Sequence, residues 1–93
     1  MNISVLKISN VTCTNANTEY SLALSEHASY FQIKARQMTS ELKLAFASGE
    51  SGTNYITLPM GSSEWMKGKI SGKKTLFFQS PQAGTVAEIL EGY

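Results

Sequence analysis

Lys74–Leu90, KTLFFQSPQAGTVAEIL, is the stretch that decides the fold, because it holds two apolar runs separated by a loop with one proline and one glycine. The first run, 75–79, is rich in aromatic and β-branched residues, which fit a pleated strand. Pro81 follows this run, where its missing backbone N–H does not interrupt a strand ladder. The second run, 85–90, is again apolar and β-branched. The sequence therefore predicts two strands that form a hairpin.

The second of these strands has apolar residues on both of its faces. Val86 and Leu90 share one face with Glu88. Ala87 and Ile89 share the other face. Two interpretations remain open: the strand is buried on both sides except at Glu88, or it is a terminal strand whose second face contacts another subunit.

A small sandwich has a single core, so one set of the C-terminal apolar residues is expected to lie outside it. Apolar residues gathered on an outer face point to a surface that a partner covers. We therefore expect a homo-oligomer built on the C-terminal strands. The residues expected at this interface are Phe77, Ala87, Ile89, Trp65 and Tyr93.

Upstream, the chain repeats the same pattern: a short run in which apolar and polar residues alternate, followed by a small polar turn. The predicted strands are 3–8, 19–25, 30–36, 41–47, 54–59, 64–70, 74–79 and 85–90. Short strands at a spacing of roughly ten residues predict a sandwich or a barrel. We expect one all-β domain over residues 1–93, a small antiparallel jelly-roll-like β-sandwich of about eight strands.

Three local features refine this prediction. The run 41–47 contains good helix formers, but its period of two and its closing Ser and Gly favour a strand. Gly68 within the sixth strand indicates a bulge or a close backbone approach. The two-glycine loop 48–53 is expected to be mobile. The predicted core consists of Leu22, Leu24, Ile33, Leu42, Leu44, Phe46, Ile56, Leu58, Leu76 and Phe78.

The composition disfavours several classes of protein. The net charge is +1 and 16% of residues are charged, so nucleic-acid binding, which needs a strong basic patch, is not expected. One cysteine permits no internal disulfide, which suits a reducing cytosol. No leader peptide and no membrane association are expected, since no apolar run approaches ~20 residues. The only basic cluster, expected at an exposed turn, is Lys67, Lys69, Lys73 and Lys74.

Candidate catalytic and metal-binding groups are sparse. Cys13 and His27 are the only thiol and imidazole, and no motif or third orienting group accompanies them. Glu64 next to Trp65 is the one acidic–aromatic pair worth naming, and a strand-end position explains it. The chain has no Asp, and nothing clusters as metal ligands do. We expect no enzyme activity, no metal and no cofactor.

Two C-terminal stretches resemble small β-sandwich virion structural proteins of tailed bacteriophages. In 42–61, LKLAFASGESGTNYITLPMG, an apolar strand ends in Phe and a Gly/Ser/Thr loop precedes Tyr-x-Thr-Leu-Pro-x-Gly. In 75–93, TLFFQSPQAGTVAEILEGY, an aromatic strand precedes Ala-Gly-Thr and Val-x-Glu-Ile-Leu. EYSLAL and FQIKAR also fit, so the resemblance covers Glu19–Tyr93. The chain departs from it at 78–80, where Arg or Asp is frequent, and at its end, where Trp is common.

The resemblance implies a non-enzymatic part of a phage particle, and its motifs are structural, so no site residue transfers. A capsid decoration or cement subunit, or a component of the head–tail or tail-fibre junction, would be a symmetric homo-oligomer, often a trimer. Its partners would be capsid or tail proteins, and it would lie in the virion after assembly in the host cytoplasm.

A carbohydrate-binding β-sandwich module is the alternative. Such modules place aromatic rings in a line on one face. Tyr55, Trp65 and Tyr93 are the residues that could form this line. Three coplanar exposed rings would support the alternative over the virion protein.

Overall fold

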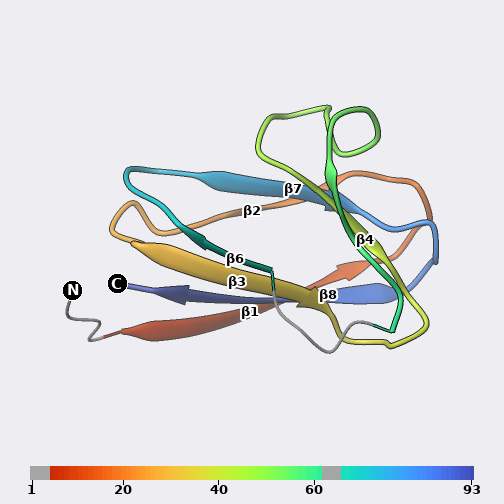
Figure 1. The fold of residues 1–93 in the computed structure, drawn as a ribbon, viewed down its shortest axis with the longest axis horizontal. Helices are drawn as coiled ribbons and strands as arrows, with labels where there is room; N and C mark the ends of the chain where they lie inside the picture. The colour runs from red at the N-terminus through yellow and green to blue at the C-terminus, as the bar shows by residue number, and fades with distance from the viewer. Residues whose placement is uncertain (1–4, 62–65) are drawn as a thin grey trace.

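Eight strands packed as two sheets make up the computed structural model, which describes residues 5–61 and 66–93 (Figure 1). The described ranges contain no helix. The strands are β1 (Leu6–Cys13), β2 (Tyr20–Ala23), β3 (Tyr30–Ala35), β4 (Leu42–Ala45), β5 (Ile56–Leu58), β6 (Met66–Lys69), β7 (Thr75–Gln79) and β8 (Thr85–Gly92). One sheet has the order β1-β8-β3-β6 and the other β2-β7-β4-β5, with antiparallel pairing throughout. The predicted all-β sandwich of eight strands is confirmed.

The pairing is nested, because β1 pairs with β8, β2 with β7, β3 with β6 and β4 with β5. A long hairpin folded over on itself gives this order. Among consecutive strands only β4 and β5 pair. The hairpin predicted at 80–84 is therefore wrong: the connection crosses between sheets, as does the turn at 71–72. Turn residues reverse the chain there, but they do not determine which strand the chain then joins.

β1 extends further than its sequence suggests, to Cys13 instead of Ile8. Asn10 and Thr12 lie on its exposed row, while Val11 and Cys13 alternate toward the core. The polar residues that looked like the start of a loop are thus the solvent-facing half of an alternating strand.

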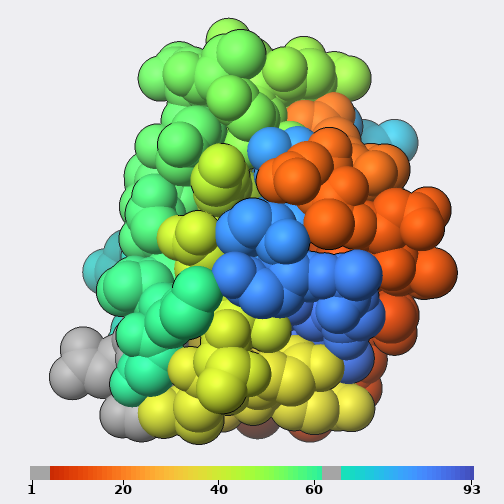
Figure 2. All heavy atoms as spheres, turned by 90° about the vertical axis from the view of Figure 1, so that its right-hand side faces the viewer, coloured from red at the N-terminus to blue at the C-terminus, as the bar shows by residue number. Residues whose placement is uncertain are grey.

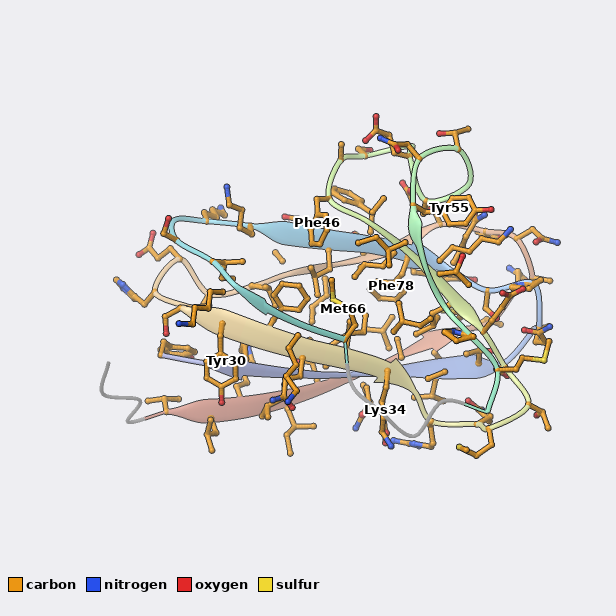
Figure 3. All side chains as sticks on the ribbon, in the orientation of Figure 1. Tyr30, Lys34, Phe46, Tyr55, Met66 and Phe78 are labelled. Carbon is orange, nitrogen blue, oxygen red and sulfur yellow. The ribbon has the colours of Figure 1, made fainter. Side chains whose placement is uncertain are left out.

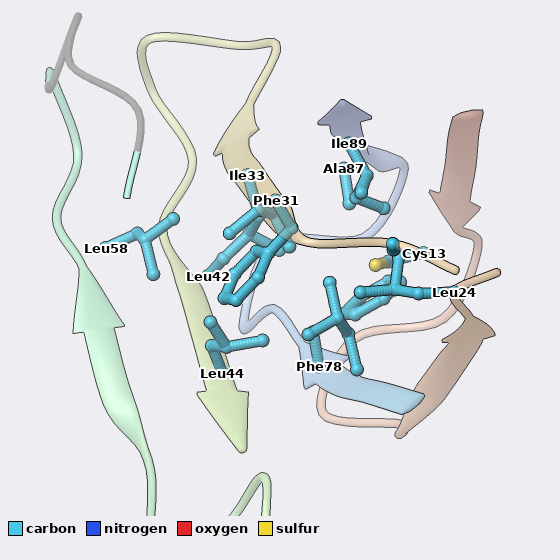
Figure 4. Close-up of a cluster of buried hydrophobic side chains, with 12 residues drawn as sticks. Cys13, Leu24, Phe31, Ile33, Leu42, Leu44, Leu58, Phe78, Ala87 and Ile89 are labelled. Atoms are coloured by element: carbon cyan, nitrogen blue, oxygen red, sulfur yellow. The ribbon is translucent and has the colours of Figure 1, made fainter. Parts of the chain in front are cut away.

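The core lies between the two sheets, and most of the predicted members are in it. Seven predicted residues are buried: Leu24, Ile33, Leu42, Leu44, Leu58, Leu76 and Phe78 (Figure 4). Leu22 is partly buried and packs against this cluster. Phe46 and Ile56 are 51% and 47% exposed, so their predicted burial is wrong. Ile56 pairs with Leu44 and shares its inward face, but it lies on an edge strand at the rim of the sandwich.

β8 is an interior strand of its sheet, flanked by β1 and β3. Ala87 and Ile89 are 0% exposed and belong to the core cluster, as Figure 4 shows. The prediction that they lie at an outer interface is wrong, because they occupy the inward row of β8. Val86 and Leu90 form the outward row with Glu88, and all three are half-buried.

Two neighbouring aromatic residues of β3 each cover a glycine on an adjacent strand. Phe31 pairs with Gly68, and a Cβ atom at Gly68 would lie 2.8 Å from the Phe31 ring. Tyr30 pairs with Gly92, where a Cβ atom would lie 2.3 Å from the Tyr30 ring. The close approach at Gly68 is thus made by the Phe31 side chain, which uses the space that the missing Cβ leaves, and not by a backbone segment or a bulge as predicted.

Glutamine side chains tie the loops together at the end of the sandwich shown in Figure 2. The Gln37 side chain accepts from the Val86 N–H at 2.9 Å and donates to the Gly84 carbonyl at 3.0 Å. Gln82 accepts from the Glu41 N–H at 3.0 Å. These bonds satisfy backbone groups that neither sheet pairs, and they link loops that lie far apart in the sequence.

The two-glycine loop, expected to be mobile, is held to the body by Glu19. One oxygen of the Glu19 carboxylate accepts from the Gly49 N–H at 2.8 Å. The other accepts from the Ser51 N–H at 3.1 Å and the Ser51 hydroxyl at 2.5 Å. Ser51 is buried as a result.

Candidate functional site

The most exposed apolar side chains of the described residues lie on β1. Leu6 is 62% and Ile8 is 70% exposed, and both belong to the outward row of this strand. In the register of the sheet, Ile8 lies opposite Leu90 of β8, and Leu6 lies opposite Gly92. The Tyr30 ring covers Gly92 on the same face. We call Leu6, Ile8, Leu90 and Tyr30 the outer patch.

The backbone of β1 is as open as its side chains. Val5 and Tyr93 exchange both of their backbone hydrogen bonds, at 2.7 and 3.0 Å. Antiparallel pairing alternates, so the N–H and C=O groups of Leu6 and Ile8 point away from β8. Among the described strands β1 pairs with β8 alone. A strand could therefore be added at this edge, directly beside the outer patch.

Ion pairs border the outer patch on the same face of the sheet. The Glu88 carboxylate lies 3.0 Å from Arg36 Nε and 3.6 Å from Lys34 Nζ. Glu88 is opposite Asn10 on β1 and opposite Lys34 on β3, one row beyond Ile8 and Leu90. An apolar centre with a charged rim is the usual composition of a protein interface.

The residues predicted at the interface do not come together. Phe77 is half-buried on the outer face of the other sheet, between Ser21 and Ala45 in the register. Tyr93 is half-buried and packs against the core. Trp65 lies outside the described residues. The outer patch instead consists of residues that the sequence analysis assigned to no site, although the weak alternation of 3–8 was a signal for Leu6 and Ile8.

Cys13 and His27 lie at opposite ends of β8. Cys13 pairs with Thr85, the first residue of that strand. Ser29, two residues after His27, donates its N–H to the carbonyl of Gly92, the last residue of β8, at 2.8 Å. Seven residues of strand separate these positions, about 23 Å at ~3.3 Å per residue. The two side chains cannot form a dyad.

Each of these two residues has a structural explanation. Cys13 is fully buried, and burial raises the pKa of its thiol to about 11. The thiol is therefore protonated at neutral pH, whereas nucleophilic attack requires the thiolate. His27 is exposed in a turn, 3.4 Å from the carboxylate of Glu26. Glu64, the other acid considered for chemistry, lies outside the described residues, as does its neighbour Trp65.

Glu91 is a buried acid that the sequence analysis did not single out. It occupies the inward row of β8, two residues after Ile89, and is 1% exposed. Its Oε1 atom accepts from the Ser25 N–H at 2.8 Å, and its Oε2 atom has no hydrogen-bond partner among the residues that the structure describes. The bond anchors the turn between β2 and β3, so the carboxylate serves the fold. The signal that could have revealed its burial is the two-residue alternation of β8, because residue 91 continues the inward row of residues 85, 87 and 89.

The aromatic line that would support a carbohydrate-binding module is not formed by the two described rings. Tyr55 lies in Figure 3 toward one end of the long axis, and the C-terminus, at Tyr93, lies toward the other end in Figure 1. The Tyr55 ring is also partly occupied, since Lys43 Nζ lies 5.0 Å from its centroid. The rings of Tyr55 and Tyr93 therefore do not share one platform.

Within residues 5–61 and 66–93, no group of three or more His, Cys, Asp or Glu side chains could hold a metal ion. The same ranges contain no helix long and apolar enough to cross a membrane. The four lysines near the β6–β7 connection are exposed, as expected. Comparisons with protein-family models, with curated proteins and with solved structures found no match to this chain.

Proposed function

We propose that the chain is a non-enzymatic structural subunit of a bacteriophage particle, which associates with copies of itself through the β1 edge and the outer patch. The observation that carries the proposal is the exposure of Leu6 and Ile8 beside an unpaired strand edge. A capsid decoration or cement subunit, or a head–tail or tail-fibre junction component, has to make such contacts. Jelly-roll sandwiches occur among viral capsid domains, which supports the proposal by analogy of fold.

The edge itself favours an added strand. Proteins that stay monomeric usually protect edge strands with proline, bulges or inward charges. β1 is eight residues long, contains no proline or glycine, and has one charged residue, Lys7. Strand addition would satisfy the free backbone groups of Leu6 and Ile8 and would cover their side chains in the same contact.

The outer patch can supply the energy of association. Covering ~100 Å² of an apolar side chain contributes ~2.5 kcal/mol at ~25 cal/mol per Å². Leu6 and Ile8 present most of their surface to solvent, and Leu90 and Tyr30 present part of theirs. A stable interface buries ~1,000 Å² or more in total, so these side chains and the backbone edge would form its centre. The ion pairs of Glu88 with Lys34 and Arg36 would form the rim of this interface.

Light scattering tests the association. We expect the chain at micromolar concentration to have a multiple of its 10.1 kDa mass, with a trimer favoured by the resemblance. Ile8→Glu should reduce the mass to that of the monomer, because it places a charge in the centre of the contact. The matched control is Thr12→Glu, which adds the same charge to the same row of β1, four residues further along. A mass of 10.1 kDa for the unmodified chain would contradict the proposal.

Mass spectrometry of purified particles tests the place of the protein. Phage particles from the strain that encodes the chain should contain it in a fixed ratio to the capsid protein. They should lose it when Ile8→Glu is introduced, if self-association is required for incorporation. Recovery of the chain only outside purified particles would refute a virion role and leave the association to be explained separately.

A further inference from the structure

An apolar cleft opens between the two sheets at the edge where β6 faces the end of β4. Its volume is about 300 Å³. Phe46, just past the end of β4, and Met66, the first residue of β6, both line it and are labelled in Figure 3. The apolar residues that line the cleft are Phe31, Phe46, Met66, Ile70 and Leu76. The cleft is separate from the outer patch, because its apolar lining belongs to the inward rows of the sandwich.

The floor of the cleft is buried in the core, and one of its walls is exposed to solvent. Phe31 and Leu76 are 2% and 0% exposed, so the floor is part of the core. Phe46 leans on this floor, with its ring 6.0 Å from that of Phe31 in an edge-to-face arrangement. Half of the Phe46 surface nevertheless faces solvent, although the residue continues the inward row of Leu42 and Leu44. Gly68, which also lines the cleft, contributes no side chain to fill it.

The charges at the cleft all have one sign. Lys69 and Lys74 line it, and no acidic residue does among those described. Lys69 belongs to the outward row of β6 with Lys67, so Lys74, next to β7, is the better placed of the two. A long lysine stem can lie along an apolar wall and hold its ammonium group at the rim. An apolar cleft with a few polar groups is the usual form of a small-molecule site.

We propose that this cleft binds an unbranched acyl chain of about ten carbons that ends in a carboxylate, the chain lying on Phe31 and Leu76 and the carboxylate at Lys74. The length of the acyl chain follows from the volume of the cleft. At ~30 Å³ for each group the size of a water molecule, the cleft holds about ten carbon groups of the chain. The sign of the head group follows from the lysines. This site is independent of the proposed virion role and of the outer patch.

Decanoate is the probe for this proposal, titrated against the intact chain below its micelle concentration and followed by methyl NMR. We expect saturable binding of one decanoate per chain, with shifts of the Met66, Ile70 and Leu76 methyl signals. Lys74→Gln should weaken decanoate binding roughly fivefold and leave binding of neutral decanol unchanged. The matched control is Lys67→Gln, on the outward row of β6, which should leave both affinities unchanged.

A second pair of variants locates the apolar part of the site. Phe46→Ser should weaken decanoate and decanol alike, by at least about tenfold, because it removes one wall of the cleft. Ile8→Ser, at an apolar residue of the outer patch that is more exposed than Phe46, should change neither affinity, and melting curves would show that both variants fold. Absence of saturation would overturn the proposal. So would binding that Ile8→Ser weakens as much as Phe46→Ser does, since the probe would then be reporting exposed apolar surface in general or a protein-binding surface.

Discussion

β8 and β4 follow the same two-residue alternation, yet their inward rows end in different surroundings. On β8, Ala87 and Ile89 are fully buried. On β4, Leu44 is buried as well, but Phe46, the next residue of the row, is half exposed. β4, like β8, has a strand on each side, but Phe46 lies past the end of β4 at the rim of the sandwich. Alternation therefore determines the direction of a side chain, and the place of the residue within or beyond the paired strands determines its burial.

The largest expected effect comes from truncating a side chain of the inward row of β4 where it is buried, compared with truncating Phe46 where the row is exposed. Leu44→Ala should lower the free energy of unfolding by ~2–5 kcal/mol, because the fully buried site would keep a cavity. Phe46→Ala should cost only ~1 kcal/mol, since it removes one edge-to-face contact and half-buried surface. Urea unfolding of the two variants measures the difference. Equal losses would mean that Phe46 is covered in solution, by a second copy or by another part of the chain.

The two glycines that face aromatic rings test the same comparison between buried and exposed positions. Their substitutions should have effects of intermediate size on stability. Gly68→Ala should destabilise the protein by ~1–3 kcal/mol, because its Cβ would press on Phe31, which is buried and cannot move away. Gly92→Ala makes a closer contact with Tyr30, yet that ring lies on the outer face and can turn toward solvent. We expect Gly92→Ala to cost less than ~1 kcal/mol in thermal unfolding. The opposite order would show that Tyr30 is held in place, as it would be under a partner subunit.

The sequence predicts the strands of this fold better than it predicts their neighbours. Seven of the ten residues predicted to form the core are buried, because alternation is a local property of the chain. Pairing is a long-range property, and neither the loop at Pro81 nor the turn at Gly72 indicates that the next strand joins the other sheet. The same limit explains the wrong prediction for Ala87 and Ile89. Both faces of β8 are apolar, so the sequence alone cannot identify the face that points into the core.

The candidate site was harder to predict than the fold. Its main residues, Leu6 and Ile8, belong to a strand whose second half looks polar, and their exposure follows from the place of β1 at the edge. Glu91 looks like part of a polar tail, yet it is buried because β8 continues to Gly92. In each case the deciding fact is where a strand lies in the sheet.

The smallest expected effect concerns the loop between β4 and β5, which a single carboxylate connects to the body. Hydrogen bonds from the Ser51 hydroxyl and the Gly49 N–H lower the pKa of Glu19 below its ordinary value of 4.5. A lowered pKa in the folded state means that the carboxylate contributes stability above pH 4.5, and this contribution is lost as the pH falls through the lowered value. The contribution is below ~1 kcal/mol, since Glu19 lies near solvent.

Amide hydrogen exchange at Gly49 and Ser51 measures this contribution directly. Relative to Glu19→Gln, the unmodified chain should protect these two amides at pH 6, and the difference should shrink as the pH falls below 4.5 through the lowered pKa of Glu19, because the protonated carboxyl is a weaker acceptor. Glu50→Gln is the matched control: it changes an acid in the same loop that does not bond to either amide. Equal protection in the unmodified chain and in Glu19→Gln at pH 6 would contradict the prediction and would mean that the loop keeps its position through its own turns. Those turns include the bonds of the Thr53 and Asn54 N–H groups to the Glu50 carbonyl, at 3.0 and 2.8 Å, which do not titrate.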